Sequence, residues 1–332
     1  MAIYDISSTW QTEVKNKARG GVPTCNDGSI SGDFVAWNKI KTLLEKSINQ
    51  GASFSNPVIS TYSLVYTAAT AYSGGVLAPN GDIHFIPYSA NRGQKIDING
   101  VVSTYSLVYT AAAAYLGGVL APNGDIIFIP LSANRGQKIN SSGTVSTYSL
   151  VYTTASAFSG GVLAPNGDIH FIPQSGAIGQ KISSAGVVST YSLIYTTTTA
   201  YHGGVLASNG DIYFVPRSAN RGQKIDINGT VSTYSLVYTA TNAFLGGALS
   251  SNGDIYFIPL VGNRGQKVSS NGIVSTYSLV YTVTNAFLGG VLNSNGDIIF
   301  VPYSAAVGQK ISALPAKPLN VATCCSPFLN KL

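Results

Sequence analysis

The sequence predicts an all-β protein folded as a six-bladed β-propeller, and three observations lead to that expectation. The nonapeptide VSTYSLVYT, or a near-copy of it, recurs six times at intervals of 43 residues, which is the usual length of one blade. The copies begin at Ile59, Val102, Val145, Val188, Val231 and Val274. Short alternating apolar segments separated by glycine turns fill each interval, as antiparallel strands do.

Within one interval the first hairpin is the easiest element to predict. Residues Gly74 to Pro87 read as two short strands around Asn80-Gly81, where we expect a two-residue type I′ turn because Asn-Gly tolerates positive φ. A third strand is predicted over Gly93 to Ile98. After another glycine turn, the repeated nonapeptide forms the fourth, outer strand, so that each interval supplies four strands.

The two ends of the array predict a closed ring. The first recognisable strand, at Ile59 to Tyr66, is a fourth strand, and the last, at Gly308 to Ile311, is a third strand. Pairing of these two segments would complete a sixth blade and leave no blade face open to water. The alternative fold is a β-solenoid with two coils per interval, which would need capping elements that the chain does not supply at its ends.

Three regions follow from this reading: an attachment extension at 1–57, the propeller at 58–312 and a C-terminal tail at 313–332 that packs near the extension. A helix is predicted after Asp33. Its apolar stripe is expected to dock on the ring or on a partner and consists of Trp37, Ile40, Leu44 and Ile48. Cys25 either pairs with Cys324 or Cys325 or stays free.

Composition narrows the class of protein. Hydrophobic residues make up 45% of the chain and charged residues only 10%, which is typical of a folded β-rich protein. No apolar run is long enough for a membrane-spanning helix, and the N-terminus does not read as a secretory signal. The localisation is left open, with a virion surface as one possibility. The formal net charge of the chain is +6, and its basic residues are spread thinly over the repeats. We therefore do not expect nucleic-acid binding.

The motif GG-V-L-x-x-N-G-D-I-x-F resembles the blade pattern of the NHL, YVTN and kelch-like propellers over about 255 residues. With small variations it begins at Gly74, Gly117, Gly160, Gly203, Gly246 and Gly289. The resemblance implies the architecture alone, because such families include enzymes, lectins and scaffolds.

No catalytic constellation is visible in the repeats, so we expect the chain not to be an enzyme. The aspartates that begin the second strands recur in every repeat and are expected to cap the hairpin turns. His84 and His170 occupy a position that is Ile or Tyr in other repeats, which favours packing. No metal-ligand spacing or cofactor motif occurs, so neither a metal nor a cofactor is predicted.

Variation among the repeats concentrates in the loops between second and third strands and between fourth and first strands. Guanidinium, aromatic and imidazole groups there suit sugar hydroxyls, carboxylates or phosphates. The predicted ligand-binding residues are Arg92, Arg135, Arg221, Arg264, Tyr88, Arg217, Tyr303 and His202.

We therefore expect a multivalent, lectin-like binding protein, displayed on a larger assembly such as a virion or phage tail. A glycan or other surface receptor and the other subunits of the assembly are its predicted partners. The first alternative is an intracellular protein-interaction scaffold. The second alternative is a propeller hydrolase or lyase, which would place convergent polar groups near the centre of the ring.

Overall fold

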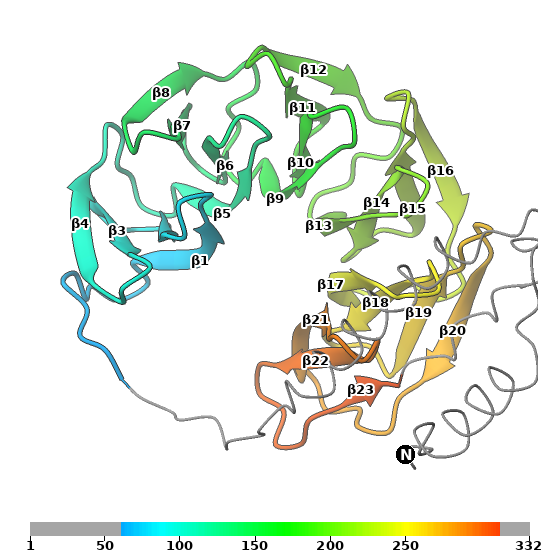
Figure 1. Ribbon diagram of the computed structural model, residues 1–332. Helices are drawn as coiled ribbons and strands as arrows, with labels where there is room; N and C mark the ends of the chain where they lie inside the picture. Colours follow the sequence, from blue (N-terminus) through cyan, green and yellow to red (C-terminus); the bar gives the residue numbers. More distant parts are fainter. Residues whose placement is uncertain (1–60, 313–332) are drawn as a thin grey trace, which may run out of the picture. The chain divides into compact units, whose positions relative to one another are not determined.

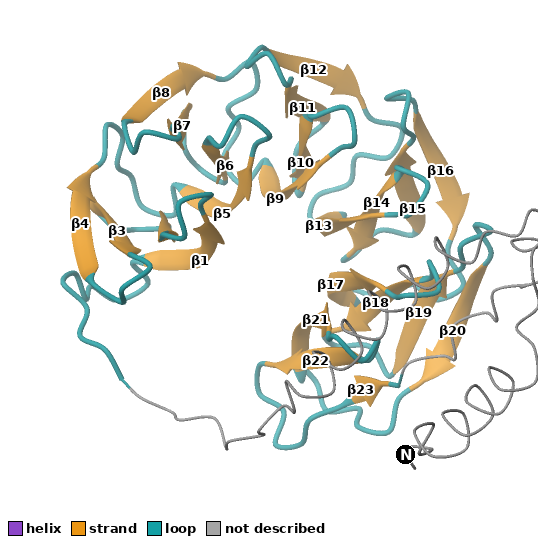
Figure 2. Cartoon of the chain, in the orientation of Figure 1, coloured by secondary structure: helices purple, strands orange, loops and turns teal. Residues whose placement is uncertain are grey.

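The computed structural model describes residues 61–312, and all regular structure in this range is β-strand (Figure 2). The all-β prediction is therefore confirmed for the repeats. The predicted helix and the docking residues Trp37, Ile40, Leu44 and Ile48 lie outside the described residues, as do the three cysteines. The part of the chain described here contains no helix that could span a membrane.

Six antiparallel sheets, called blades 1 to 6 in chain order, contain 23 strands. The first strands are β1 (Tyr72–Leu77), β5 (Tyr115–Leu120), β9 (Phe158–Leu163), β13 (Tyr201–Leu206), β17 (Phe244–Leu249) and β21 (Phe287–Leu292). The second strands are β2 (Ile83–Pro87), β6 (Ile126–Pro130), β10 (Ile169–Pro173), β14 (Ile212–Pro216), β18 (Ile255–Pro259) and β22 (Ile298–Pro302).

Third and fourth strands continue each sheet in sequence order. The third strands are β3 (Arg92–Ile96), β7 (Arg135–Ile139), β11 (Ile178–Ile182), β15 (Arg221–Ile225), β19 (Arg264–Val268) and β23 (Lys310–Ile311). The fourth strands are β4 (Val102–Ser106), β8 (Val145–Ser149), β12 (Val188–Ser192), β16 (Val231–Ser235) and β20 (Val274–Ser278). Blades 1 to 5 thus have four strands and blade 6 has three.

The Asn-Gly hairpin differs from the predicted type I′ turn. Only Gly81 has positive φ, at 88°, and its amide donates to the carbonyl of Ala78 at 3.0 Å. The Oδ1 atom of Asn80 accepts from the amide of Asp82 at 3.1 Å. The connection is therefore a longer turn closed by a left-handed glycine, and asparagine is favoured because its side chain satisfies a turn amide.

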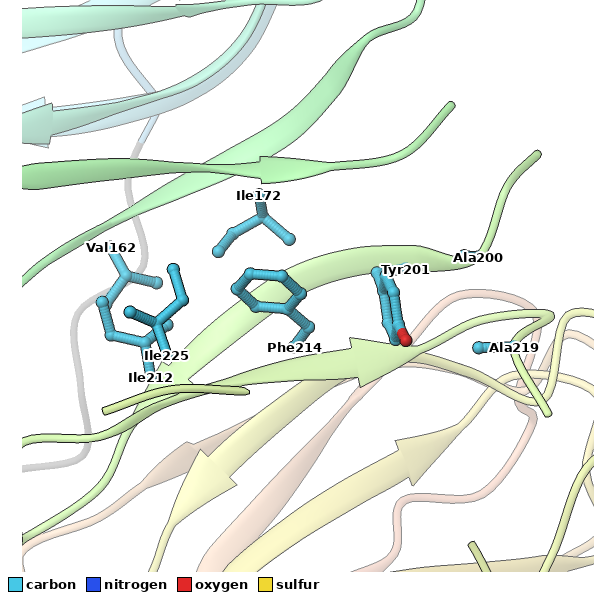
Figure 3. Packing of buried hydrophobic residues seen from close by; sticks show 8 residues of the cluster. All are labelled: Val162, Ile172, Ala200, Tyr201, Ile212, Phe214, Ala219 and Ile225. Carbon is cyan, nitrogen blue, oxygen red and sulfur yellow. The ribbon is translucent and has the colours of Figure 1, made fainter. Parts of the chain in front are cut away.

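Neighbouring blades pack face to face, and their first strands contact one another in chain order (Figure 1). At the boundary of blades 3 and 4, Val162 and Ile172 from blade 3 meet Phe214 and Ile212 from blade 4 (Figure 3). Four similar clusters occupy the other boundaries between consecutive blades. The hydrophobic core is thus divided among blade boundaries, as the sequence predicts for a propeller.

Glycine in the first strand allows this close approach. A Cβ on Gly161 would lie 2.6 Å from Cδ1 of Ile129, and one on Gly204 would lie 2.8 Å from Cδ1 of Ile172. Contacts this short would push a buried isoleucine out of its packed position or move the blade, which explains one glycine of the Gly-Gly pairs in blades 2 to 6. The aromatic residue that begins the strand is buried in blades 2 to 6, as Tyr115 is in blade 2, and is part of the core.

A glutamine of the third-strand segment, buried in blades 1 to 5, joins the exit of the preceding fourth-strand segment to the next blade. The Oε1 atom of Gln137 accepts hydrogen bonds from the amides of Val108 and Tyr109, at 2.9 and 2.8 Å. Equivalent pairs of hydrogen bonds reach Gln94, Gln180, Gln223, Gln266 and Gln309. The repeated nonapeptide is therefore a fourth strand over its first half and a link between blades over its second.

The predicted closing strand, Ile59 to Tyr66, begins outside the described residues, and its pairing with the end of blade 6 is not seen among residues 61–312. Among them β23 pairs only with β22, and Thr61 to Ser63 are not in a strand. Ile83 in blade 1 is 39% exposed, whereas its equivalent in blade 2, Ile126, is 1% exposed. The five buried clusters of the described residues lie at the boundaries between consecutive blades, and none of them joins blade 6 to blade 1.

A pair of glycine substitutions tests this open end. Gly179 lies under the ring of Tyr191, and a Cβ would come within 2.1 Å of it, whereas nothing lies within 4 Å of a Cβ on the equivalent Gly308. We expect Gly179→Ala to lower the free energy of unfolding by about 2 kcal/mol or more, and Gly308→Ala to change it by less than about 0.5 kcal/mol. Urea denaturation measures both; an equal loss in the two variants would contradict the open arrangement.

Candidate functional site

The blade end that carries the Asn-Gly turns is held by a repeated ion pair. Nζ of Lys95 lies 2.6 Å from Oδ2 of Asp82, and the same pair recurs in all six blades at 2.6 to 2.8 Å. The hydrogen bond from Lys95 is the main cause that lowers the pKa of Asp82. These aspartates therefore bind a lysine on the third strand, instead of serving only as caps of their turns as predicted.

A cavity of about 330 Å³ lies at this end between blades 1 and 2. Its lining includes His84 and the Lys95–Asp82 pair. Because every blade repeats that pair, we assign it to the fold and not to a reaction.

His84 and His170 are packing residues, as predicted. Both are buried, and each imidazole makes an edge-on contact with a tyrosine of the fourth strand, Tyr105 and Tyr191 respectively. Burial lowers the pKa of His170 to about 4, with a further lowering from Lys181 that Asp168 opposes. His170 is thus neutral in the folded protein at pH 7.

Because burial lowers the pKa of His170, we expect the free energy of unfolding to fall in acid. Its pKa is about 4 when folded and about 6.5 when unfolded, so the unfolded state binds more protons between these values. Stability is fully present above about pH 6.5 and declines, by up to about 3 kcal/mol, as the pH falls towards 4. We expect His170→Ile, which copies Ile127, to reduce this decline in urea denaturation at pH 7, 5.5 and 4.5; an unchanged pH dependence would contradict the assignment.

The predicted ligand-binding residues gather at the opposite end of the blades. Arg92, Arg135, Arg221 and Arg264 each begin a third strand with exposed side chains. Tyr88 is half-buried, and Tyr303 in blade 6 is 65% exposed. Tyr88 and Arg92 flank one loop of blade 1, and the other four residues belong to loops of other blades. From different loops of the predicted set, the structure brings together His202 and Arg217.

His202 lies in β13 and is partly buried, not on a surface loop. Its Nδ1 atom lies 2.9 Å from the carbonyl oxygen of Leu245 in the next blade, and a carbonyl can only accept, so Nδ1 carries the proton. Ser73, at the equivalent position in blade 1, also donates to the next blade, to the carbonyl oxygen of Tyr115 at 3.1 Å, which is one residue earlier in the repeat than Leu245. What distinguishes His202 is its second nitrogen, Nε2, which in this tautomer can accept a proton.

Arg217 follows β14 and is oriented by Asn242, whose Oδ1 accepts from Nε at 2.8 Å. Asn242 has φ of 56°, a left-handed conformation that asparagine tolerates better than most residues. The other blades carry Thr70, Ala113, Ser156, Thr199 and Asn285 at this strained position. Asn242 was not among the residues predicted from the sequence. Its position in one of the variable loops between fourth and first strands could have indicated it.

Burial lowers the pKa of His202, and nearby Arg217 adds to this effect, while the hydrogen bond to Leu245 opposes it. The imidazole is therefore neutral near pH 7 and can act as a general base through Nε2. The remaining donors of Arg217 can stabilise negative charge that develops beside it. Among residues 61–312 no three His, Cys, Asp or Glu side chains gather to hold a metal ion.

Comparison with known families gives the decisive observation. The sequence profile described as the virginiamycin B lyase family matches residues 45–309, which is most of this chain. The chain belongs to that family. This family takes the place of the NHL, YVTN or kelch-like groups that the sequence motif suggested. The expectation of a repeat propeller is unchanged.

Solved structures agree on the fold. A catalytically inactive histidine-to-alanine variant of virginiamycin B lyase from Staphylococcus aureus, with quinupristin, is 19% identical; the match covers 73% of this chain and 84% of that chain with a TM-score of 0.62. A streptogramin B lyase is 21% identical, with coverage of 74% and 84% and the same TM-score. A protein from Lactobacillus plantarum is 13% identical, with coverage of 75% and 82% and a TM-score of 0.58. A search of curated proteins finds no match.

Family membership corrects two expectations from the sequence. A lyase family points to an enzyme, so the prediction of a non-enzymatic, glycan-binding display protein is overturned, and with it the prediction that the chain is not an enzyme. None of the comparisons supports a virion component or a lectin. The second alternative, a propeller hydrolase or lyase, agrees best with these findings.

Proposed function

We propose that this protein is an enzyme of the lyase class and that its reaction takes place around His202 at the arginine-bearing end of blade 4. The match to the virginiamycin B lyase family over residues 45–309 carries this proposal. His202 supports it because it combines a fixed tautomer, a lowered pKa and a neighbouring guanidinium. A histidine replacement also inactivates the Staphylococcus aureus relative.

In this proposal His202 and Arg217 divide the chemistry of an elimination. Nε2 of His202 removes a proton from a carbon next to an electron-withdrawing group, and the electron pair of that C–H bond forms a double bond as the leaving group departs. The proton stays on Nε2 until the leaving group or solvent takes it. Arg217, held by Asn242, stabilises the negative charge that forms in the substrate. No water is consumed.

The proposal is tested with quinupristin, the compound named with the staphylococcal relative, as the first probe. We expect slow conversion without the addition of one water, which mass spectrometry separates from hydrolysis. His202→Ala should lower the rate at least about 100-fold, the usual scale for a general base. His84→Ile, a buried histidine at the other blade end replaced by the residue that blades 2 and 6 carry, should retain the rate.

The pH profile separates a base from a packing role. Because His202 must be neutral to accept a proton, the rate should be flat near pH 7 and fall on the acidic side of its ordinary pKa of about 6.5. Conversion that persists in His202→Ala, or a hydrated product, would contradict the assignment. If quinupristin is not converted, a panel of esters and lactones that carry a proton next to the carbonyl tests the same chemistry, and no His202-dependent turnover in the panel would overturn it.

A further inference from the structure

Charge in the described residues is divided between the two ends of the blades. All eight carboxylates and all six lysines lie at or near the Asn-Gly turns, where six of the carboxylates are paired. All five arginines lie at the other end, and no carboxylate of residues 61–312 lies there. One end of the propeller thus presents positive charge that no acidic side chain of this range neutralises.

Four of the arginines belong to a repeated two-residue unit. In blades 1, 2, 4 and 5 an exposed asparagine precedes each exposed arginine. The units are Asn91-Arg92, Asn134-Arg135, Asn220-Arg221 and Asn263-Arg264. Blades 3 and 6 carry Ala177-Ile178 and Ala306-Val307, so both polar residues are replaced together. Such joint replacement indicates that the amide and the guanidinium work as a unit.

The units have a fixed backbone and free side chains. The hydroxyl of Tyr115 donates to the carbonyl of Arg135 at 3.1 Å, and the amide of Asn134 faces the hydroxyl of Tyr109 at 3.5 Å. Arg135 also pairs with Ser149 across the sheet. Neither side chain has a hydrogen bond or ion pair with another described residue. The backbone therefore fixes where each unit lies, and its side-chain donors are available to a ligand.

We propose that the Asn-Arg units bind oxyanions, and that a ligand with two or more phosphate or carboxylate groups bridges units on adjacent blades. A guanidinium offers parallel donors that fit an oxyanion, and the neighbouring amide adds another donor. Blades 1 and 2 form one such adjacent pair, and blades 4 and 5 form the other. The proposal does not depend on the role of His202, because the units lie on third strands and not beside β13.

Inorganic tripolyphosphate and citrate are the probes, and isothermal titration at low ionic strength is the measurement, since salt screens exposed charges. We expect at least one probe to bind. Arg92→Gln/Arg135→Gln should weaken binding at blades 1 and 2 about tenfold, the scale for two exposed charge contacts, and leave the pair on blades 4 and 5 as the one tight site in the titration. Asn91→Ala/Asn134→Ala should weaken it by a smaller factor without a change of charge. The ratio of the two probes distinguishes phosphate from carboxylate recognition.

Two further variants separate a site from net charge. Thr144→Glu/Val187→Glu changes the net charge as much as the double arginine variant does, but at the exposed turns of the other end, and should leave the affinity within about twofold. Ala177→Asn/Ile178→Arg installs a unit in blade 3 and should tighten binding severalfold. No binding of either probe, or equal weakening in the glutamate variant and the arginine variant, would overturn the proposal.

Discussion

The arrangement of the described blades depends on one steric constraint, the absence of a side chain on the first strand of blades 2 to 6 where the preceding blade packs against it. Cδ1 of Ile129 occupies the space that a Cβ on Gly161 would take, and the same contact joins Ile172 to Gly204. Apolar side chains of two sheets can then interdigitate at interior density. A single blade has no such partner, so its apolar faces would be open to water.

This packing also explains why a nearly uniform repeat can place one distinct site. The backbone of each blade is fixed by its neighbours, and a change at one loop position alters chemistry without altering the frame. In blade 4 the position that is Ser73 in blade 1 becomes His202, whose Nδ1 still donates to a backbone carbonyl of the next blade. Arg217 and Asn242 add a guanidinium of fixed orientation beside it. A general base thus arises from a residue that also serves the fold.

The fold could be predicted from the sequence because the 43-residue interval and the strand alternation act locally and are repeated six times. The curvature of the array could not, because it depends on side-chain contacts such as Ile172 on Gly204, whose geometry no sequence period specifies. The site was found in part. His202 and Arg217 stand out as variable loop residues, but the carbonyl of Leu245 and the side chain of Asn242 are brought to them only by the packing of blades 4 and 5. The enzyme family is recognised by a sequence profile that extends over residues 45–309, and no short motif within one blade indicates it.

Amide hydrogen exchange along the described blades tests most directly the claim that each blade is stabilised by its neighbours. The account predicts the slowest exchange in β6, β10, β14 and β18, which have a blade on both sides, and faster exchange in β2 and β22 at the two open ends. Equal, slow exchange in the second strands of all six blades would contradict it, because it would mean that blades 1 and 6 cover each other in solution.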